Sequence, residues 1–201
     1  MKITSIKQQV KRANRYSIFV DDVYAFSLSE SGLLSQGLAT GQEFDKNELE
    51  KLKQASGADK AYGNALRYVA MRPRSEWEMR TYLERKDVEE PVVQTIMQRL
   101  RDVDLLNDKL FATAWVDNRR LLKNTSKRRL QLELKQKRVP ESIIAEALRE
   151  DEVDERAILR QLVDKKRSRY PDRNKFMQYL ARQGFSYDDI KSVLSATDED
   201  N

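Results

Sequence analysis

Early in the chain the spacing of apolar residues changes, and this change predicts two kinds of structure. Residues 3–28 are rich in β-branched and aromatic residues, and Tyr16, Ile18 and Val20 alternate along the chain so that they share one face. Alternation is typical of a half-buried strand. The pair Asp21-Asp22 suits a turn into a second antiparallel strand over Val23–Leu28. We therefore expect a small N-terminal β-hairpin or β-rich element over residues 1–44, packed on a further strand or helix.

After this element the apolar spacing is helical. Asp45 with Glu48 three residues later resembles a capping box, in which the two side chains satisfy free amides at a helix N-terminus. The four prolines all fall where helices should start or stop, and no strand pattern follows. The composition, 35% charged with six glycines, also favours a helix-rich protein.

The helical part contains one pattern three times. Its core positions are Met79, Leu83 and Val88 in the first copy, Leu130, Leu134 and Val139 in the second, and Phe176, Leu180 and Phe185 in the third. Each copy ends in a helix, a tight break and another helix, and is preceded by one more helix. A mainly α chain follows, with three tandem three-helix repeats in an elongated, curved array. The expected boundaries are a connecting helix over 45–58, repeats over 59–107, 108–152 and 153–197, and an acidic tail over 198–201.

Missing residue types exclude several kinds of chemistry. The chain has no cysteine and no histidine, which excludes disulfides, the usual zinc sites, Ser-His triads and histidine general bases. We expect no metal and no cofactor. The absence of a long apolar run or a signal-peptide pattern predicts a cytoplasmic protein with no membrane association.

The most basic part of the chain is residues 119–139. Nine basic residues stand there against one acid, Glu133, although the whole chain carries a net charge of only +5. The basic residues are Arg119, Arg120, Lys123, Lys127, Arg128, Arg129, Lys135, Lys137 and Arg138. Because a helical leucine pattern runs through the same segment, the charge belongs to a folded element, and it points to a polyanion or an acidic protein surface as partner.

Comparison of the copies separates core from surface. At about 100° per residue, Arg128 and Lys135 lie on nearly the same helix face, opposite the buried leucines, with Arg129 further round. The matching positions hold Trp77, Glu78 and Glu84 in the first copy and Asn174, Lys175 and Ala181 in the third. The core therefore repeats and this basic surface does not, which favours a binding role. The alternative is a solvated face, the usual fate of charge runs on helices.

Two other groups of basic residues are candidates for the same role. Lys165, Lys166, Arg167 and Arg169 form a second cluster, although such charges commonly complement a helix C-terminus. In Arg72-Pro-Arg-Ser-Glu76 the proline, serine and glutamate suit a helix boundary, whereas Arg72 and Arg74 are left for acids or a ligand.

Aromatic and acidic residues offer weaker alternatives. Aromatic rings interleaved with basic residues can stack the bases of single strands, but their helical spacing here favours core packing; these rings are Tyr62, Tyr68, Tyr82, Trp77 and Trp115. Asp102, Asp104 and Asp108 have the chemistry of a hard-metal site, yet acids are common at helix junctions. A carboxylate-metal nuclease is therefore the remotest possibility.

Taken together, these motifs resemble the RecX family, bacterial regulators of the RecA recombinase. The resemblance covers nearly the whole chain and rests on Ala65, Leu66, Tyr68, Arg72, Arg74, Ser75, Glu76 and Leu83, on Leu105–Asp108 with Phe111 and Ala112, on Leu134–Val139, and on Leu180–Phe185 with Tyr187, Asp188 and Ile190. The family often has glycine just after the second helix of a repeat. Only Gly184 keeps that pattern; Asp87 and Arg138 occupy the other two places. We expect those two helix ends to close differently.

The resemblance implies a non-enzymatic regulator that binds RecA or its filament on single-stranded DNA. It would inhibit strand exchange, ATP hydrolysis or coprotease activity in recombination and SOS repair, and we expect it to act as a monomer. The competing hypothesis is a helical-repeat protein that binds nucleic acid directly without RecA. The candidate contact residues are Arg72, Arg74, Arg119, Arg120, Lys123, Lys127, Arg128, Arg129, Lys135, Lys165, Lys166, Arg167 and Arg169.

Overall fold

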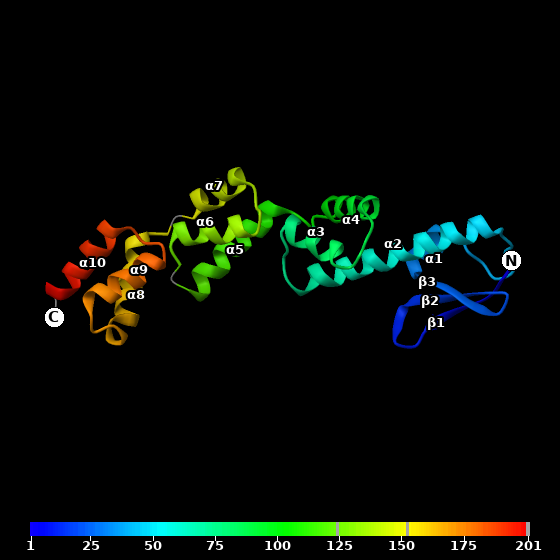
Figure 1. Ribbon diagram of the computed structural model, residues 1–201, viewed down its shortest axis with the longest axis horizontal. Helices are drawn as coiled ribbons and strands as arrows, with labels where there is room; N and C mark the ends of the chain where they lie inside the picture. The colour runs from blue at the N-terminus through cyan, green and yellow to red at the C-terminus, as the bar shows by residue number, and fades with distance from the viewer. Residues whose placement is uncertain (124, 152, 200–201) are drawn as a thin grey trace. The chain divides into compact units, whose positions relative to one another are not determined.

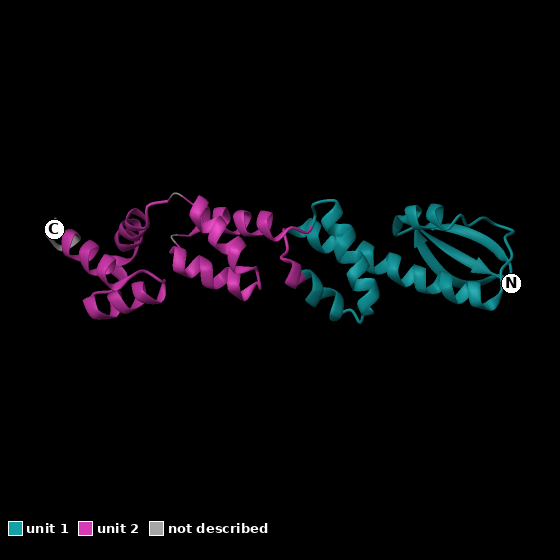
Figure 2. Cartoon of the chain, turned by 90° about the horizontal axis from the view of Figure 1, so that it is seen from above, with its two compact units in different colours: residues 1–72, 79–105 teal, residues 73–78, 106–201 magenta. Residues whose placement is uncertain are grey.

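The computed structural model describes residues 1–123, 125–151 and 153–199. The described chain forms two compact units, residues 1–72 with 79–105 and residues 73–78 with 106–201 (Figure 2). In order, the elements are β1 (Ile3–Gln9), β2 (Arg12–Val20), β3 (Val23–Ser29), α1 (Glu30–Ser35), α2 (Lys46–Met71), α3 (Glu76–Glu84), α4 (Glu90–Asp102), α5 (Asp108–Leu122), α6 (Lys127–Gln136), α7 (Glu141–Glu150), α8 (Glu155–Lys166), the 3-10 turn η1 (Arg167–Arg169), α9 (Arg173–Arg182) and α10 (Tyr187–Glu199) (Figure 1).

This order confirms the predicted fold class, a mainly helical chain with three three-helix repeats after a small β element. Helix α10 includes residues 198–199 of the predicted acidic tail, and residues 200–201 lie outside the described part. Within the described residues, none of the helices combines the length and apolar character that crossing a lipid bilayer takes.

The N-terminal element is a three-stranded antiparallel sheet in the order β1-β2-β3. Asp21 and Asp22 form the two-residue turn between β2 and β3, with φ of 47° and 66°, as the twist of a tight hairpin favours. One face of the sheet is buried, with Ile18 and Phe26 opposite each other across the strands. Leu49 of α2 packs into the same cluster, so the helix supplies the partner that an isolated hairpin lacks.

Helix α2 runs unbroken through the first unit. Asp45 caps its N-terminus in a full capping box with Glu48, both hydrogen bonds measuring 2.8 Å. The connecting helix expected over 45–58 and the helix expected from residue 60 are one 26-residue helix. Gly57 does not break it, because one glycine costs a helix only about 1 kcal/mol and buried side chains further along, such as Ala65, hold the helix in place.

The second helix of each repeat ends in the same left-handed conformation. Asp87, Arg138 and Gly184 have φ of 53°, 56° and 96°. After two of these residues the chain closes identically, with the amides of Val88 and Val139 bonded to carbonyls five residues back at 3.3 and 3.2 Å. The expectation that Asp87 and Arg138 close differently is therefore wrong: burial of the next apolar residue and the closing bond outweigh a left-handed cost of about 1–2 kcal/mol.

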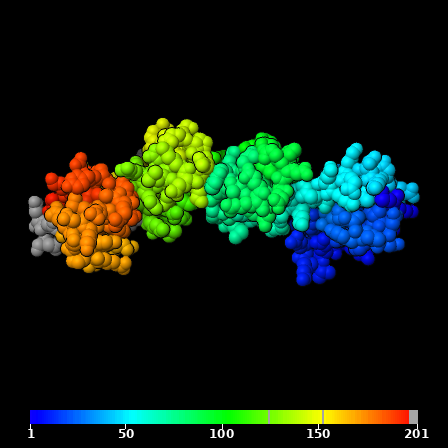
Figure 3. Space-filling model, in the orientation of Figure 1, coloured from blue at the N-terminus to red at the C-terminus, as the bar shows by residue number. Residues whose placement is uncertain are grey.

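The second and third repeats each have a core of their own. Helices α5–α7 enclose a cluster around Leu130, Leu134 and Ile144. Helices α8–α10 enclose a second one around Phe176 and Leu180. Each set forms a compact body (yellow-green, and orange to red, in Figure 3), as expected of repeats that bury their apolar faces within three helices.

Candidate partner-binding surface

Helix α6 begins at a capped N-terminus that carries only positive charge. The Ser126 side chain accepts the Arg129 amide at 3.1 Å, while Leu130 and Leu134 are fully buried. The first turn is Lys127, Arg128 and Arg129, with no acid. Cations at a helix N-terminus oppose the helix dipole and cost about 0.3–1 kcal/mol each. Helix stability therefore does not explain these three residues.

Most side chains of this first turn reach solvent. Arg128 and Arg129 are exposed and Lys127 is half-buried; Lys135, in the last turn of the helix, is also exposed. We call these four residues the α6 basic face. Lys135 pairs with Glu141 at 3.0 Å and Arg129 approaches Glu133 at 3.6 Å, whereas Arg128 forms no ion pair with any described residue. Ion pairs between exposed side chains contribute about 0–1 kcal/mol to stability, so an anionic group of a partner can take the place of these acids.

Arg119, although within the basic segment, is engaged internally. Its Nε donates to Glu133 Oε2 at 2.7 Å, and its guanidinium lies 4.5 Å from the Trp115 ring centroid. Trp115 Nε1 also donates to Glu133, at 3.0 Å. Burial disfavours the ionised form of Glu133, but these hydrogen bonds and the charges of Arg119 and Arg129 outweigh it and hold its pKa below the ordinary value. Arg119 therefore anchors α6 to α5.

Arg120 is also structural. Its side chain is only 11% exposed and binds Asp151 through Nε at 3.1 Å. It also donates to the Thr125 carbonyl and lies 3.8 Å from Glu155. A buried arginine that satisfies a buried carboxylate cannot leave without stranding that charge, at a cost of about 3–5 kcal/mol. We therefore leave Arg119 and Arg120 out of the binding face. Lys123, at the end of α5, is exposed and remains a candidate contact.

The matching positions of the other copies are arranged differently. Glu78, which matches Arg129, is buried and pairs with Lys137 at 2.6 Å. In α9 the matching residues are exposed and carry two charges; they are Arg173, Asn174, Lys175 and Ala181. The α6 basic face thus has no counterpart in the described part of the first repeat and only a partial one in the third, where Arg128 and Lys135 match uncharged residues.

Ser126 also fastens α6 to the third repeat. Its hydroxyl donates to the carbonyl of Gln183 at 2.7 Å while accepting the Arg129 amide. The next residue, Gly184, leaves no room for a side chain, since a Cβ there would lie 2.4 Å from Ser126 Oγ. The amide of Lys127 completes the joint by donating to Glu155 at 2.5 Å. The serine thus satisfies a cap and a buried carbonyl together.

The same joint recurs at the start of α3, in the segment 73–78 that belongs to the second unit. Ser75 accepts the Glu78 amide at 3.2 Å and donates to the Lys137 carbonyl at 2.9 Å. The Glu76 amide donates to Asp108 at 2.8 Å. Sequence reasoning assigned Ser75 a cap but missed the bond to Lys137. The signal was available, since Ser75 and Ser126 occupy matching positions in the repeat alignment.

The second cluster of basic candidates lies apart from this face. Lys165 and Lys166 end α8 and Arg167 and Arg169 form η1, so their charges complement the C-terminal dipole of α8. Because α6 contacts the opposite end of α8, through Glu155, about 18 Å of helix separates the two clusters. Arg74 is buried and Arg72 is exposed.

The expected aromatic packing is largely present. Tyr68 stacks on Tyr82 with ring centroids 4.1 Å apart, Tyr62 lies under the Arg99 guanidinium at 3.6 Å, and Trp115 joins the second-repeat cluster. Trp77 is the exception, with 41% of its surface exposed.

The acids considered for a metal site do not gather. Asp108 accepts the Glu76 amide and opens α5. Across the described residues, no three acidic side chains come close enough together to hold a metal ion.

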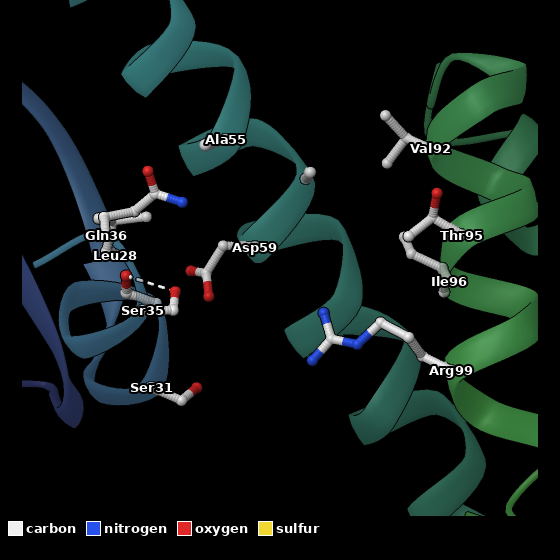
Figure 4. A pocket seen from close by; sticks show the side chains of 12 residues that line it. Leu28, Ser31, Ser35, Gln36, Ala55, Asp59, Val92, Thr95, Ile96 and Arg99 are labelled. Atoms are coloured by element: carbon white, nitrogen blue, oxygen red, sulfur yellow. Dashed lines mark hydrogen bonds between the residues drawn. The ribbon is translucent and has the colours of Figure 1, made fainter. Parts of the chain in front are cut away.

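A cleft of about 460 Å³ lies in the first unit between α1, α2 and α4 (Figure 4). Its acid, Asp59, is already bound by Arg15 at 2.9 Å and by the Ser29 amide at 2.8 Å, and Ser35 bonds a backbone carbonyl. Asp59 and Ser35 are therefore engaged within the fold and do not supply the free convergent polar groups that usually mark a ligand site.

Four family models match successive parts of this chain. Residues 1–45 match the Regulatory protein RecX N-terminal domain, and residues 61–100, 107–148 and 154–194 match the first, second and third RecX three-helix domains. The chain belongs to the RecX family.

Curated relatives and solved structures agree with this membership. A "Regulatory protein RecX" from Halalkalibacterium halodurans is 37% identical over 73% of this chain, although the match spans only 56% of that relative. Its namesake from Bacillus subtilis is 31% identical over 99% of this chain and 78% of its own. A crystal structure of regulatory protein RecX superposes with a TM-score of 0.75 at 29% identity, covering 96% of this chain and 98% of the other. RecX from Lactobacillus salivarius gives 0.63, also at 29% identity, over 72% and 98%.

Proposed function

We propose that this RecX family member is a non-catalytic regulator that binds RecA on single-stranded DNA through the α6 basic face and inhibits strand exchange, ATP hydrolysis and coprotease activity. It would act in recombination and SOS repair, as a monomer and in the cytoplasm, where that recombinase works. One observation carries the assignment of the face: α6 keeps three cations in a first turn where they weaken the helix, and Arg128 and Lys135 match no basic residue in the other described repeats.

The chemistry of the face suits an acidic partner. Arg128 forms no ion pair with any described residue. Lys135 pairs with Glu141, which is exposed, and Arg129 approaches Glu133 only to 3.6 Å. Contacts of lysine and arginine with phosphates or surface carboxylates form at long range and weaken steeply as salt rises. We expect inhibition of RecA to weaken in the same way between about 50 and 200 mM salt.

The test is a charge reversal with a matched control. Arg128→Glu, Arg129→Glu and Lys135→Glu, made together, should weaken inhibition of RecA ATPase on single-stranded DNA by at least about tenfold. The control reverses Lys46, Lys51 and Lys60, which are exposed on α2, and so changes the net charge equally. Circular dichroism should show unchanged helicity in both variants.

The outcomes separate the face from the function. Full inhibition by the α6 variant would exclude the α6 basic face as the contact. No effect of the parent protein on RecA at stoichiometric ratios would exclude RecA regulation itself.

Direct binding of nucleic acid without RecA is the second candidate. It is favoured by the exposed Arg128, which pairs with no acid among the described residues, since arginine binds phosphate bidentately. Nanomolar binding of DNA at physiological salt, with RecA absent and lost in the α6 variant but kept in the α2 control, would support it over the first proposal.

A further inference from the structure

The outward face of the N-terminal sheet carries aromatic and basic side chains. The buried face contains Ile18, so alternation places Ser17 and Phe19 outward. Across the strands, Lys7 lies opposite Ser17 and Tyr24 lies opposite Phe19. Helix α2 runs along the sheet in Figure 1, and it packs on the buried face through Leu49 and Leu52. Phe19 and Tyr24 lie on the opposite face, where Phe19 is half-buried and Tyr24 is exposed.

Tyr24 and Phe19 hold each other in a defined geometry. Their ring centroids are 6.0 Å apart and their planes meet at 78°, an edge-on contact. The Lys7 ammonium lies over the Phe19 ring, 5.1 Å from its centroid. Tyr24 is 55% exposed and therefore presents much of its ring to solvent. An aromatic ring fixed by its neighbours loses little side-chain entropy when a ligand stacks on it.

Fold stability does not require this arrangement. Burial contributes stability in proportion to the apolar area removed from water, and more than half of the Tyr24 surface remains exposed to water. Lys7 forms no ion pair with any described residue, so its ammonium is available to an anion.

The surrounding charge is positive. Residues 1–29 contain five basic residues and two acids, and one of the five, Arg15, is buried and paired with Asp59. The acids, Asp21 and Asp22, both lie in the β2–β3 turn. Lys11 and Arg12 are exposed where the β1–β2 turn enters β2, and Arg12 lies about 23 Å from Phe19 along the strand. A path from Tyr24 past Lys7 to the β1–β2 turn therefore runs from an aromatic ring to cations.

We propose that this sheet face is a binding site for a short single strand of nucleic acid, with one base stacked on Tyr24 and the phosphodiester backbone following Lys7 towards Lys11 and Arg12. Single strands are bound by exposed rings on a sheet together with a positive track, because every base has a π-face and every linkage a negative charge. Phe19 is a positioning residue that orients Tyr24. The site is separate from the α6 basic face and does not depend on it.

The test uses the full chain carrying the α6 charge-reversal triple, which removes any nucleic-acid binding by that face. Anisotropy of labelled oligothymidylate and oligouridylate of about 12 nucleotides, at about 50 mM salt, measures what remains. Tyr24→Ala should weaken binding by about fivefold, equivalent to about 1 kcal/mol for one stacked base. Lys7→Gln should weaken it less and flatten its salt dependence.

Matched controls distinguish the site from a general loss of rings or charge. Tyr187→Ala removes an equally accessible tyrosine, 65% exposed on α10, and Lys51→Gln an exposed lysine on α2; both should bind as the parent does. Photo-crosslinking of a halogenated oligonucleotide should label Tyr24. Tighter binding of oligothymidylate would identify DNA as the ligand, and tighter binding of oligouridylate would identify RNA. No binding by the parent, or binding by Tyr24→Ala within about twofold of it, would overturn the proposal. Neither result depends on whether RecA is inhibited.

Discussion

Helices α6 and α9 occupy the same place in successive repeats, and their buried residues correspond: Leu130 and Leu134 match Phe176 and Leu180. Both end in a left-handed residue, Arg138 or Gly184. Yet Glu133 in α6, held by Arg119 and Trp115, matches Tyr179 in α9, which stacks on Tyr170 at 4.9 Å. One half-buried position thus accepts an ion pair with α5 in the second repeat and an aromatic ring stacked on the segment before α9 in the third.

The comparison also separates conserved geometry from surface chemistry within this one chain. The core leucines and the serine joints recur because each repeat must fold and each must meet the next. The first turn of α6 carries three cations that nothing in the fold requires. A surface that differs while its scaffold repeats is where a repeat protein places its specificity.

The largest effect is expected at Gly184, where α9 meets Ser126. Gly184→Ala should lower the free energy of unfolding by about 3 kcal/mol, since alanine resists a φ of 96° and its Cβ would lie 2.4 Å from Ser126 Oγ. Urea denaturation followed by circular dichroism measures the change. Gly57→Ala makes the same substitution within a helix and in open space, so it should stabilise by up to about 1 kcal/mol. Equal effects at both sites would contradict the close contact between Gly184 and Ser126.

The next effect is pH-dependent and concerns Glu133. Its pKa is lowered in the folded protein, so its stabilising contribution is present above the unfolded value of about 4.3 and is lost as pH falls through the folded value. Glu133→Gln should cost about 2 kcal/mol at pH 7 and progressively less as the medium is acidified below about pH 4. Denaturation across this range measures it.

The exposed Glu141 is the control for that experiment. Its pKa is also lowered, by a hydrogen bond from Lys135, but its side chain is 65% exposed, and water screens the pair. Glu141→Gln should therefore change stability little at any pH. A cost for Glu133→Gln that stayed constant down to acid pH would show that the carboxylate charge does not anchor α6.

The smallest effect is expected at Arg138, the counterpart of Gly184. Arg138→Gly should stabilise the protein by about 0.5 kcal/mol, because glycine adopts a φ of 56° without the steric cost that arginine has. Arg138→Ala removes the same charge but keeps a Cβ, so it should bring no gain. Thermal melting compares the two. If both variants melted at the same temperature, loss of the charge, and not relief of the backbone conformation, would explain their change from the parent protein.

Much of the fold was predictable because it depends on local periodicity. Helical spacing and the repeated Leu130–Leu134 pair predicted three three-helix repeats, and the family models and the fold confirm them. The Asp45 cap and the Asp21-Asp22 turn were also predictable, since each involves residues a few positions apart. The continuity of α2 through Gly57 was not, because tertiary burial decides whether a helix tolerates its glycines.

The candidate surface was only half predictable. The sequence by itself determined that positive charge concentrates in residues 119–139 and that Arg128, Arg129 and Lys135 have no matching cluster in the other copies. Only the tertiary structure decided that Arg119 and Arg120 belong to the interior, because their partners, Glu133 and Asp151, lie 14 and 31 residues further along the chain. Charge and helical phase are local properties, whereas ion pairing depends on which distant residues the fold brings within about 4 Å.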